Sequence, residues 1–176
     1  HAMATMMVGR EIADLFPEKI AADPNLPTAL SVENVSVPGW ASDVSFSVRP
    51  GEILGFAGLV GAGRTELFEG ILGLRPASGA IKRDGKPIQL KSPRDATRHG
   101  LAYLSEDRKG KGLHVDFPLR PNLTLMALER YAKPLLDHEA EQRALETAVD
   151  EFGIRAGSLG MKAASLSGGN QQKLAL

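Results

Sequence analysis

One glycine-rich stretch has the residue types and spacing of a phosphate-binding loop. Residues 58–65 read GLVGAGRT, which fits the pattern G-x-x-x-x-G-[K/R]-T. Glycines let the backbone curl so that successive N–H groups point inward at an anion, and the start of a following helix adds partial positive charge. The hydroxyl of Thr65 is placed to bind Mg²⁺ beside the phosphates. The stretch predicts a nucleotide-phosphate site made by these residues: Gly58, Gly61, Ala62, Gly63, Arg64, Thr65 and Glu66.

The segments on either side must hold this loop in place. The apolar run Ile53–Ala57 predicts a buried strand leading into the loop, and residues 64–74 have the apolar spacing of a helix. A plain glycine-rich turn would need neither this strand nor Thr65. A dinucleotide loop of the pattern G-x-G-x-x-G is excluded, because Glu66 stands where its third glycine would fall.

The loop departs from the usual pattern at Arg64, where such loops carry lysine. A guanidinium is wider, planar and forked, so it cannot replace a compact ammonium between the terminal phosphates without a change in geometry. Each backbone donor contributes about 1.5–3 kcal/mol to a charged group, so we expect binding to survive. Hydrolysis needs a closely positioned terminal phosphate, and we expect it to be the greater loss.

A second group of exposed amides is predicted near the other end of the chain, where residues 166–173 read LSGGNQQK. Ser167 is predicted to cap a helix beginning at Asn170, and the two preceding glycines expose backbone N–H groups. Alone, this would be an ordinary cap. Paired with a phosphate loop 102 residues earlier, from Thr65 to Ser167, it predicts a second anion site. Its residues are Ser167, Gly168, Gly169, Asn170 and Gln171.

Composition narrows the class of protein. The 176 residues fit one domain or two lobes with a sizeable core. Lys plus Arg and Asp plus Glu both number 21, and this balance argues against a nucleic-acid binder. The absence of cysteine fits a reducing cytoplasm, the four histidines lack metal-ligand spacing, and no apolar run reaches the roughly 18–20 residues of a membrane span.

The remaining segments predict a mixture of strands and helices. Partial alternation over residues 30–48 predicts antiparallel strands, and the Asp-Gly pair inside residues 79–90 predicts a tight hairpin. Ser92 with Pro93 marks a helix start, and residues 100–104 predict a short strand.

A longer helix is predicted after Asp137, which would cap it, with Gly153 at its end. Its apolar stripe is Leu145, Ala148, Val149 and Phe152. Before residue 30, a short apolar helix pattern is followed by a proline-broken linker.

Three stretches together resemble a known family: residues 50–65, the segment YLSEDRK at 103–109, and LSGGNQQK at 166–173. They are similar to the second nucleotide-binding half of tandem ABC ATPases from bacterial ribose-, galactose- and xylose-type importers. Residues 7–10, MVGR, resemble the junction that ends the first half. The resemblance covers essentially the whole chain after residues 1–4, which we interpret as a cloning scar.

The resemblance implies an α/β fold: an incomplete ABC-type P-loop NTPase core with an antiparallel β subdomain and a helical signature subdomain. Residues 5–29 would be the end of the preceding half and a linker. Residues 30–100 would form the β subdomain and P-loop core. Residues 101–176 would hold the Q-loop and the helical subdomain, ending in the signature helix.

In that family two halves sandwich two ATP molecules, each held by one half's loop and the other half's signature. The resemblance implies ATP and Mg²⁺ as cofactors and an intact signature that completes the first half's site. Glu106 stands where the Q-loop glutamine is usual, so Thr65 and Glu106 are the implied metal-contacting residues. A carboxylate there adds negative charge beside the phosphates.

The implied partners are the first nucleotide-binding half, a transmembrane permease subunit and, indirectly, a periplasmic sugar-binding protein, at the inner face of the cell membrane. Two functions stay open. The chain couples ATP binding and hydrolysis to sugar import with its own site degenerate, or it is a non-hydrolytic module that lends its signature to a partner half. Residues 7–10 disfavour a third option, a non-transport ABC protein.

In the family, the strand ending in Asp-Glu, the D-loop and the switch histidine follow the signature helix, beyond Leu176. The resemblance therefore predicts no ATP turnover by this chain. It also predicts that Ile53–Ala57 keeps an unpaired apolar edge, so that the chain self-associates or reorganises its core.

Two assignments have alternatives. Trp40, 24 residues before Arg64, would stack on adenine or pack in the core or on the surface. The apolar stretch 112–119 would face the permease or pack in the core, and residues 108–111 would be a solvated turn.

Overall fold

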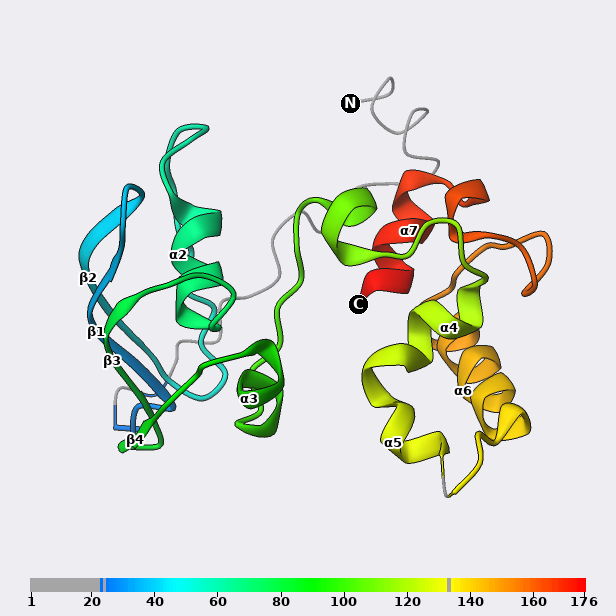
Figure 1. The fold of residues 1–176 in the computed structure, drawn as a ribbon, viewed down its shortest axis with the longest axis horizontal. Coiled ribbons are helices and arrows are strands. Elements are labelled where there is room, and N and C mark those ends of the chain that lie inside the picture. The colour runs from blue at the N-terminus through cyan, green and yellow to red at the C-terminus, as the bar shows by residue number, and fades with distance from the viewer. Residues whose placement is uncertain (1–22, 24, 133) are drawn as a thin grey trace. The chain divides into compact units, whose positions relative to one another are not determined.

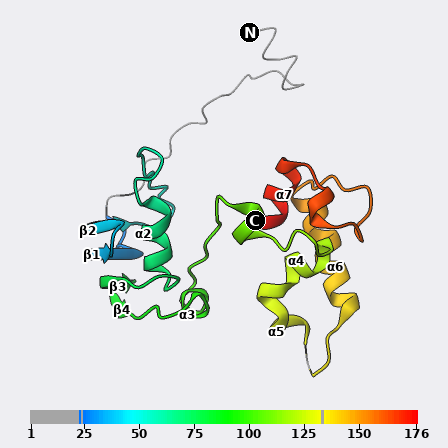
Figure 2. The same ribbon diagram turned by 45° about the horizontal axis from the view of Figure 1, so that its top comes forward.

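The computed structural model describes residues 23, 25–132 and 134–176. The chain divides into two compact units between Leu101 and Ala102, and each unit is described by itself (Figures 1 and 2). The helix and the junction predicted before residue 23 lie outside the described residues, as does the linker that continues to residue 29, apart from residues 23 and 25–29.

The first unit is built on a four-stranded antiparallel sheet with strand order β2-β1-β3-β4. The strands are β1 (Leu30–Val37), β2 (Ala41–Val48), β3 (Ser78–Arg83) and β4 (Lys86–Ile88). The antiparallel strands predicted over residues 30–48 are confirmed. The predicted hairpin is also confirmed, because Asp84 and Gly85 join β3 to β4 with positive φ angles of +50° and +74°.

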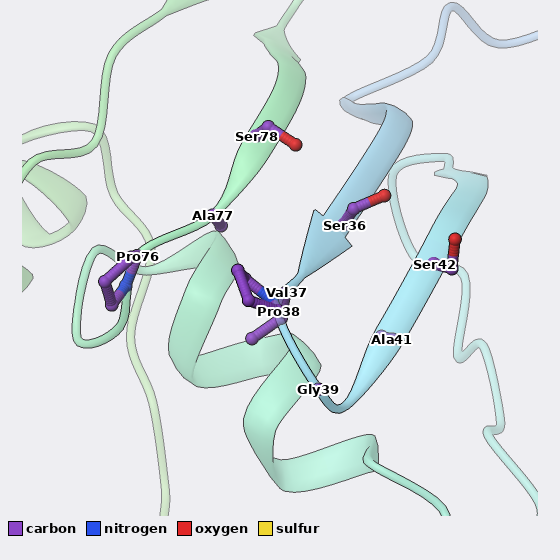
Figure 3. A pocket seen from close by; sticks show the side chains of 9 residues that line it. All are labelled: Ser36, Val37, Pro38, Gly39, Ala41, Ser42, Pro76, Ala77 and Ser78. Atoms are coloured by element: carbon purple, nitrogen blue, oxygen red, sulfur yellow. The ribbon is translucent and has the colours of Figure 1, made fainter.

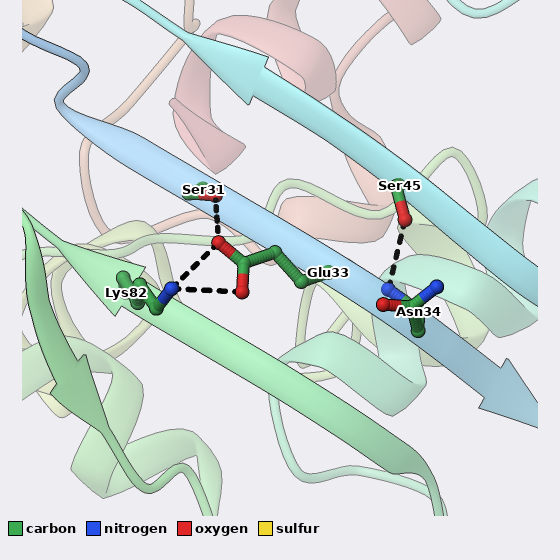
Figure 4. A network of polar contacts seen from close by, with 5 residues as sticks. All are labelled: Ser31, Glu33, Asn34, Ser45 and Lys82. Carbon is green, nitrogen blue, oxygen red and sulfur yellow. Dashed lines mark hydrogen bonds and ion pairs between the residues drawn. The ribbon is translucent and has the colours of Figure 1, made fainter.

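Polar side chains on β1 tie it to both neighbouring strands (Figure 4). Lys82 on β3 donates to both carboxylate oxygens of Glu33 at 2.8 Å, and Ser31 donates to the same carboxylate at 3.0 Å. These contacts lower the pKa of Glu33, with Lys82 as the main cause. On the other side, the Asn34 N–H donates to the Ser45 hydroxyl at 2.8 Å. These polar contacts are accessible to solvent, so we expect them to fix the pairing of the strands more than to raise the free energy of unfolding.

Helix α2 (Arg64–Ile71) covers one face of this sheet (Figure 1). Its buried Leu67 and Ile71 pack with Val32 and Val35 of β1. Three aromatic rings beside this cluster meet edge to face, with centroid distances of 4.9 Å and 5.0 Å: Phe46, Phe56 and Phe68. This packing fixes the axis of α2, and with it the direction in which its first turn points.

The short helix α3 (Pro93–Arg98) follows β4. The Ser92 hydroxyl accepts the Asp95 N–H at 3.3 Å, and Pro93 occupies the first helical position, which confirms the predicted helix start.

Two predicted strands are wrong. Residues 53–57 and 100–104 are not part of any described strand, Gly100 lies in a turn, and Ile53 is 98% exposed. A strand needs a neighbour to satisfy its N–H and C=O groups, and none of the four described strands pairs with either segment. Of the first segment, Phe56 alone is assigned to the hydrophobic cluster under α2.

The second unit is helical. Its elements are the π-helical turn η1 (Arg108–Gly112), α4 (Leu119–Thr124), the 3₁₀ turn η2 (Leu125–Ala127), α5 (Leu128–Tyr131), α6 (His138–Glu151), the 3₁₀ turn η3 (Ala163–Ser165) and α7 (Gly168–Ala175). They enclose a second core made by Leu113, Leu119, Leu145, Ile154, Ala163, Leu166 and Leu174.

Helix α6 begins and ends as predicted. The Asp137 carboxylate accepts the Ala140 N–H at 2.9 Å, and Gly153 follows the last turn with φ +59°. Leu145 and Ala148 are buried, whereas Phe152 is 42% exposed and leaves the predicted stripe. Its departure follows from its place at the C-cap, where the helical repeat ends.

Stretch 112–119 is anchored in the core by two leucines, whereas most of its other residues are exposed, so core packing and contact with a permease both stay open. Leu113 and Leu119 are buried in the helical core, and Val115 packs against it. Phe117 is half exposed, and its ring stacks on His114 with 5.3 Å between centroids.

A buried polar pair joins α4 to α6. Thr124 donates to the Glu141 carboxylate at 2.6 Å, and both residues are almost fully buried. His138, largely exposed, contacts the other carboxylate oxygen at 3.0 Å. The hydrogen bond from Thr124, and then that from His138, hold the pKa of Glu141 below its ordinary value despite burial.

Candidate functional site

The phosphate loop lies directly before α2, so the helix predicted to follow it is confirmed. Ala62 donates its N–H to the Leu59 carbonyl at 3.1 Å, which closes a tight turn inside the loop. The first helical bond runs from the Leu67 N–H to the Gly63 carbonyl at 2.8 Å. The amides of the first helical turn therefore have no intrahelical acceptor and lie at the positive end of the helix dipole.

The loop glycines adopt backbone shapes that other residues resist. Gly61 and Gly63 have φ angles of +82° and +77°, in the left-handed region. A Cβ at Gly63 would also overlap the main-chain carbonyl of Trp40, whereas one at Gly61 would meet nothing within 4 Å. A Cβ at Gly58 would lie 3.1 Å from the Ala62 methyl. The protein's own packing therefore requires glycine at position 63.

The side chains that follow the loop are partly buried in the first turn of α2: Arg64, Thr65 and Glu66. The Arg64 side chain folds back over the start of the loop, with its Cδ and Nε each 3.7 Å from the place of a Cβ on Gly58. A guanidinium in this position lies beside the predicted phosphate cradle, where the pattern calls for a lysine amine.

Trp40 lies beside the loop and outside the core. Its ring is 49% exposed, and the guanidinium carbon of Arg75 lies 5.8 Å from the ring centroid. Arg75 in turn pairs with the carboxylate of Glu69, a buried residue of α2. Core packing of Trp40 is thus excluded, and adenine stacking and surface packing stay open.

A hollow of about 450 Å³ opens beside the β1–β2 turn (Figure 3). Small side chains of this turn and of the start of β3 line it: Ser36, Val37, Pro38, Gly39, Ala41, Ser42, Pro76, Ala77 and Ser78. No charged side chain lines it, and none of the residues predicted to bind phosphate belongs to its lining.

The signature stretch begins its helix earlier than predicted. Helix α7 starts at Gly168 rather than Asn170, and Ser167 occupies the N-cap position with extended backbone. The predicted capping bond is wrong, because no backbone N–H reaches the Ser167 hydroxyl. The hydroxyl instead accepts the Asn170 side-chain amide at 3.0 Å.

The two signature glycines are exposed and have no steric need to be glycine. Neither Gly168 nor Gly169 has a positive φ angle. A Cβ on Gly168 would meet Arg108 at an ordinary 3.5 Å, and one on Gly169 would meet nothing within 4 Å. Alanine forms helices more readily than glycine, so nothing in the described packing requires glycine at either position. A bare backbone here fits the close approach of a ligand.

The other predicted signature residues hold α7 in place. Asn170 accepts the Arg155 N–H at 3.0 Å, and Lys173 donates to the Gly153 carbonyl at 2.8 Å. Gln171 is 3% exposed and donates to the Ala163 carbonyl at 3.1 Å. Roles of Asn170 and Gln171 as ligands stay predictions, and their observed contacts orient the helix.

Glu106 is exposed on the segment before η1, and Arg108 contacts the signature. The prediction of a solvated turn at residues 108–111 is confirmed for Lys109, Gly110 and Lys111, which are exposed, whereas Arg108 is half-buried and its guanidinium donates to the carbonyl of Gly168. Sequence patterns miss this contact because it joins positions 60 residues apart. A hollow of about 270 Å³ is lined by Glu106, Arg108 and Gln172, among others.

Thr65 belongs to the first unit and Glu106 to the second, so their joint role at Mg²⁺ stays a prediction. Within residues 25–132 and 134–176, no three His, Asp or Glu side chains gather closely enough to hold a metal by themselves. A cation here would need oxygen atoms of the nucleotide as further ligands, which is the ordinary way that Mg²⁺ binds beside phosphates.

Comparison with known families decides what these features belong to. The ABC transporter family model matches residues 41–176, which include both the phosphate loop and the signature. The chain belongs to the ABC transporter family.

Relatives within this family carry the names that the resemblance implied. The chain is 43% identical over 171 residues to the ribose import ATP-binding protein RbsA of Geobacillus kaustophilus, covering 96% of this chain and 34% of the relative. It is 43% identical over 178 residues to a putative ribose/galactose/methyl galactoside import ATP-binding protein of Burkholderia ambifaria, covering 100% and 34%. The chain thus spans about a third of the length of the relatives it matches.

Solved ABC structures confirm the expected fold class. A dimeric ATP-binding cassette in a post-hydrolysis state with ADP and Pi matches 83% of this chain and 66% of its own, with a TM-score of 0.64 and 16% identity. A bacterial Atm1-family ABC exporter with ATP bound matches 99% and 31%, with a TM-score of 0.58 and 20% identity. Among the described residues of this ABC chain, no helix has the length and apolar character needed to cross a bilayer.

Proposed function

We propose that the chain is the second nucleotide-binding half of a bacterial sugar importer of the ribose/galactose type. In this proposal its own loop binds ATP with Mg²⁺, and its signature completes the ATP site of the first half. The names of the relatives and the match of the family model to residues 41–176 support the importer assignment. The bare backbone at Gly168 and Gly169 is the observation that carries the signature role.

The chain's own site is proposed to bind nucleotide and to hydrolyse it poorly or not at all. The left-handed glycines and the start of α2 supply amides for the phosphates. Arg64 lies back over the loop, and the exposed carboxylate of Glu106 replaces a neutral amide. An anion near the terminal phosphate opposes the charge that a phosphoryl-transfer transition state carries, so positioning and electrostatics both disfavour turnover.

The proposed partners are the first nucleotide-binding half, a membrane permease and, through it, a periplasmic sugar-binding protein, which places the chain at the inner face of the membrane. Exposed large apolar side chains in the helical unit support a protein partner, since such groupings mark interaction surfaces. They follow α4 and precede α6: Leu125, Met126, Leu128, Leu135 and Leu136. A nucleic-acid partner is not proposed, given the zero net charge.

Self-association of the chain is a further prediction. The segment before and within the phosphate loop exposes three large apolar side chains almost fully: Ile53, Leu59 and Val60. Contact between copies would remove these groups from water. Light scattering that finds only monomer at concentrations of tens of micromolar would contradict it.

ATP titration with and without Mg²⁺ tests the proposed site, with Arg64→Lys and Thr65→Ala as paired variants. We expect weak Mg²⁺-dependent binding by the parent chain, and binding tighter by about threefold to tenfold in Arg64→Lys, because an ammonium fits between phosphates. Thr65→Ala should lose the Mg²⁺ dependence. A parent chain that binds no ATP would contradict nucleotide binding at this loop.

Phosphate release measured on the same samples separates the two functions left open by the sequence. No turnover by the parent or by Arg64→Lys, with binding intact, fits the non-hydrolytic module. Mg²⁺-dependent turnover by the parent would show an active ATPase at this half and contradict the proposed loss of hydrolysis.

A further inference from the structure

The segment that carries Glu106 forms a closed turn with its own hydrogen bonds. The buried Ser105 hydroxyl accepts the Asp107 N–H at 3.2 Å, and the Asp107 carboxylate accepts the Gly110 N–H at 2.9 Å. The Asp107 carbonyl accepts two further amides, those of Lys111 at 2.9 Å and Gly112 at 3.0 Å. A turn with this many internal bonds moves as one piece.

Arg108 extends from this turn to the first residue of α7. Its guanidinium donates to the Gly168 carbonyl, and its two terminal nitrogens lie 3.5 Å and 3.7 Å from the place of a Cβ on Gly168. Both terminal nitrogens of the guanidinium therefore lie close to the signature backbone. A bond from a charged donor is stronger and more directional than a neutral one.

Other side-chain hydrogen bonds of α7 lead to other segments, while Leu174 packs with Leu113 in the helical core. Asn170 and Lys173 hold the segment at 153–155, and Gln171 holds Ala163. Arg108 thus joins the Glu106 turn to the glycine backbone of the signature. This backbone is the start of α7, which binds nucleotide in the proposed function. Arg108 lies outside the hydrophobic core cluster, so its truncation leaves that packing in place.

We propose that Arg108 is a positioning residue that makes the Glu106 turn and the signature amides move together. Its consequence for nucleotide rests on the proposed function: a change at Glu106, the Q-loop position of this half, would reach the signature that serves the other half. The contact itself is a property of this chain alone. It is therefore testable without nucleotide.

The test perturbs the turn and observes the signature by nuclear magnetic resonance on the 176-residue chain. Ser105→Ala removes the hydroxyl that accepts the Asp107 N–H and changes no charge, so a long-range field effect is avoided. We expect the amide signals of Gly168 and Gly169 to move in Ser105→Ala. In an Arg108→Ala background, the same substitution should not shift the Gly168 and Gly169 signals from their positions in Arg108→Ala alone.

Two controls accompany this double-mutant comparison. Gln172 and Ala175 line the same hollow as Ser105, so their signals should move in both backgrounds and show that the perturbation is present. Lys109→Ala removes an exposed cation from the same turn and should leave the response of Gly168 intact. Arg108→Lys keeps charge and one donor and should restore part of the response.

The proposal is overturned if Ser105→Ala moves the amide signals of Gly168 and Gly169 equally with and without Arg108. It is also overturned if Lys109→Ala abolishes this response as fully as Arg108→Ala does. Should Arg108→Ala fail to fold, Arg108→Met, which keeps the apolar stem and has no donor, carries the same comparison, and an undiminished response there is the overturning result. Because no nucleotide is present, failure of ATP to bind would contradict the proposed function and leave this result unaffected.

Discussion

The phosphate loop and the signature are both glycine-rich starts of helices, yet their glycines are there for different reasons. At the loop, Gly63 has a left-handed backbone and sits against the Trp40 carbonyl, so the fold itself demands it. At the signature, Gly168 and Gly169 have ordinary helical backbone and room for a Cβ. The packing of the chain explains the first glycine, whereas nothing in the described packing requires glycine at the other two positions.

This difference gives a general way to separate structural from ligand-related glycines. A positive φ angle or a close backbone neighbour accounts for glycine without any ligand. A helical glycine with open space is a weaker helix former than alanine, and the proposed close approach of a ligand to the backbone would account for it. By that criterion the signature, and not the loop, is the stronger evidence for a ligand.

Replacement of Gly63 by alanine should have the largest effect. We expect the free energy of unfolding to fall by about 2–4 kcal/mol, from left-handed strain together with overlap at the Trp40 carbonyl. Gly61→Ala is the matched control, because it has the same backbone strain and open space, and should lose only about 1–2 kcal/mol. Urea unfolding of both variants measures the difference, and equal losses would remove the packing argument.

The buried carboxylate of Glu141 contributes to the stability of the helical unit outside the signature. The pKa of Glu141 is lowered from 4.5, chiefly by the Thr124 hydrogen bond. Its contribution is therefore present above about pH 4.5 and is lost as the pH falls through the lower folded value. We expect Glu141→Gln to flatten the decline of the unfolding free energy on acidification below pH 4.5.

Thermal unfolding of the parent and of Glu141→Gln across pH 3–7 measures this. His138→Gln is the partner control, since His138 faces the same carboxylate from α6 while Thr124 and Arg120 lie on α4. His138→Gln should weaken the acid dependence of stability less than Glu141→Gln does, because the Thr124 hydrogen bond is the largest cause of the lowered Glu141 pKa. Parallel curves for parent and Glu141→Gln would show that this pair carries no acid sensitivity.

The smallest expected change is at the signature. Gly169→Ala should leave the unfolding free energy unchanged or raise it by up to about 1 kcal/mol, because alanine is the better helix former and meets nothing there. Gly168→Ala should behave alike, with an ordinary contact to Arg108. A loss above about 1 kcal/mol in either variant would mean that the fold needs these glycines after all.

Local patterns predicted the parts of the fold that depend on residues close together in the sequence. The hairpin at Asp84 and Gly85, the caps at Ser92 and Asp137, and the helix after the loop all follow from sequence within a few positions. The strand predicted at 53–57 was wrong because a strand depends on a partner elsewhere in the sheet, and periodicity does not supply one.

The candidate site divides in the same way. Spacing was enough to find the loop and the signature, since both are continuous motifs. The bond from Arg108 to Gly168 and the inward role of Gln171 depend on how distant segments pack, and no local signal marks either. Ser167 occupies the predicted N-cap position without the capping bond, and its hydroxyl accepts the Asn170 side-chain amide.

ATP-dependent association with a first nucleotide-binding half tests the central claim most directly, measured by sedimentation velocity with Mg²⁺ for the parent chain and Gly169→Ala. The account predicts that the parent associates only when ATP is present, and that Gly169→Ala, folded as stably as the parent, does not. Association of Gly169→Ala as strong as that of the parent would contradict the claim that a ligand requires the bare signature backbone.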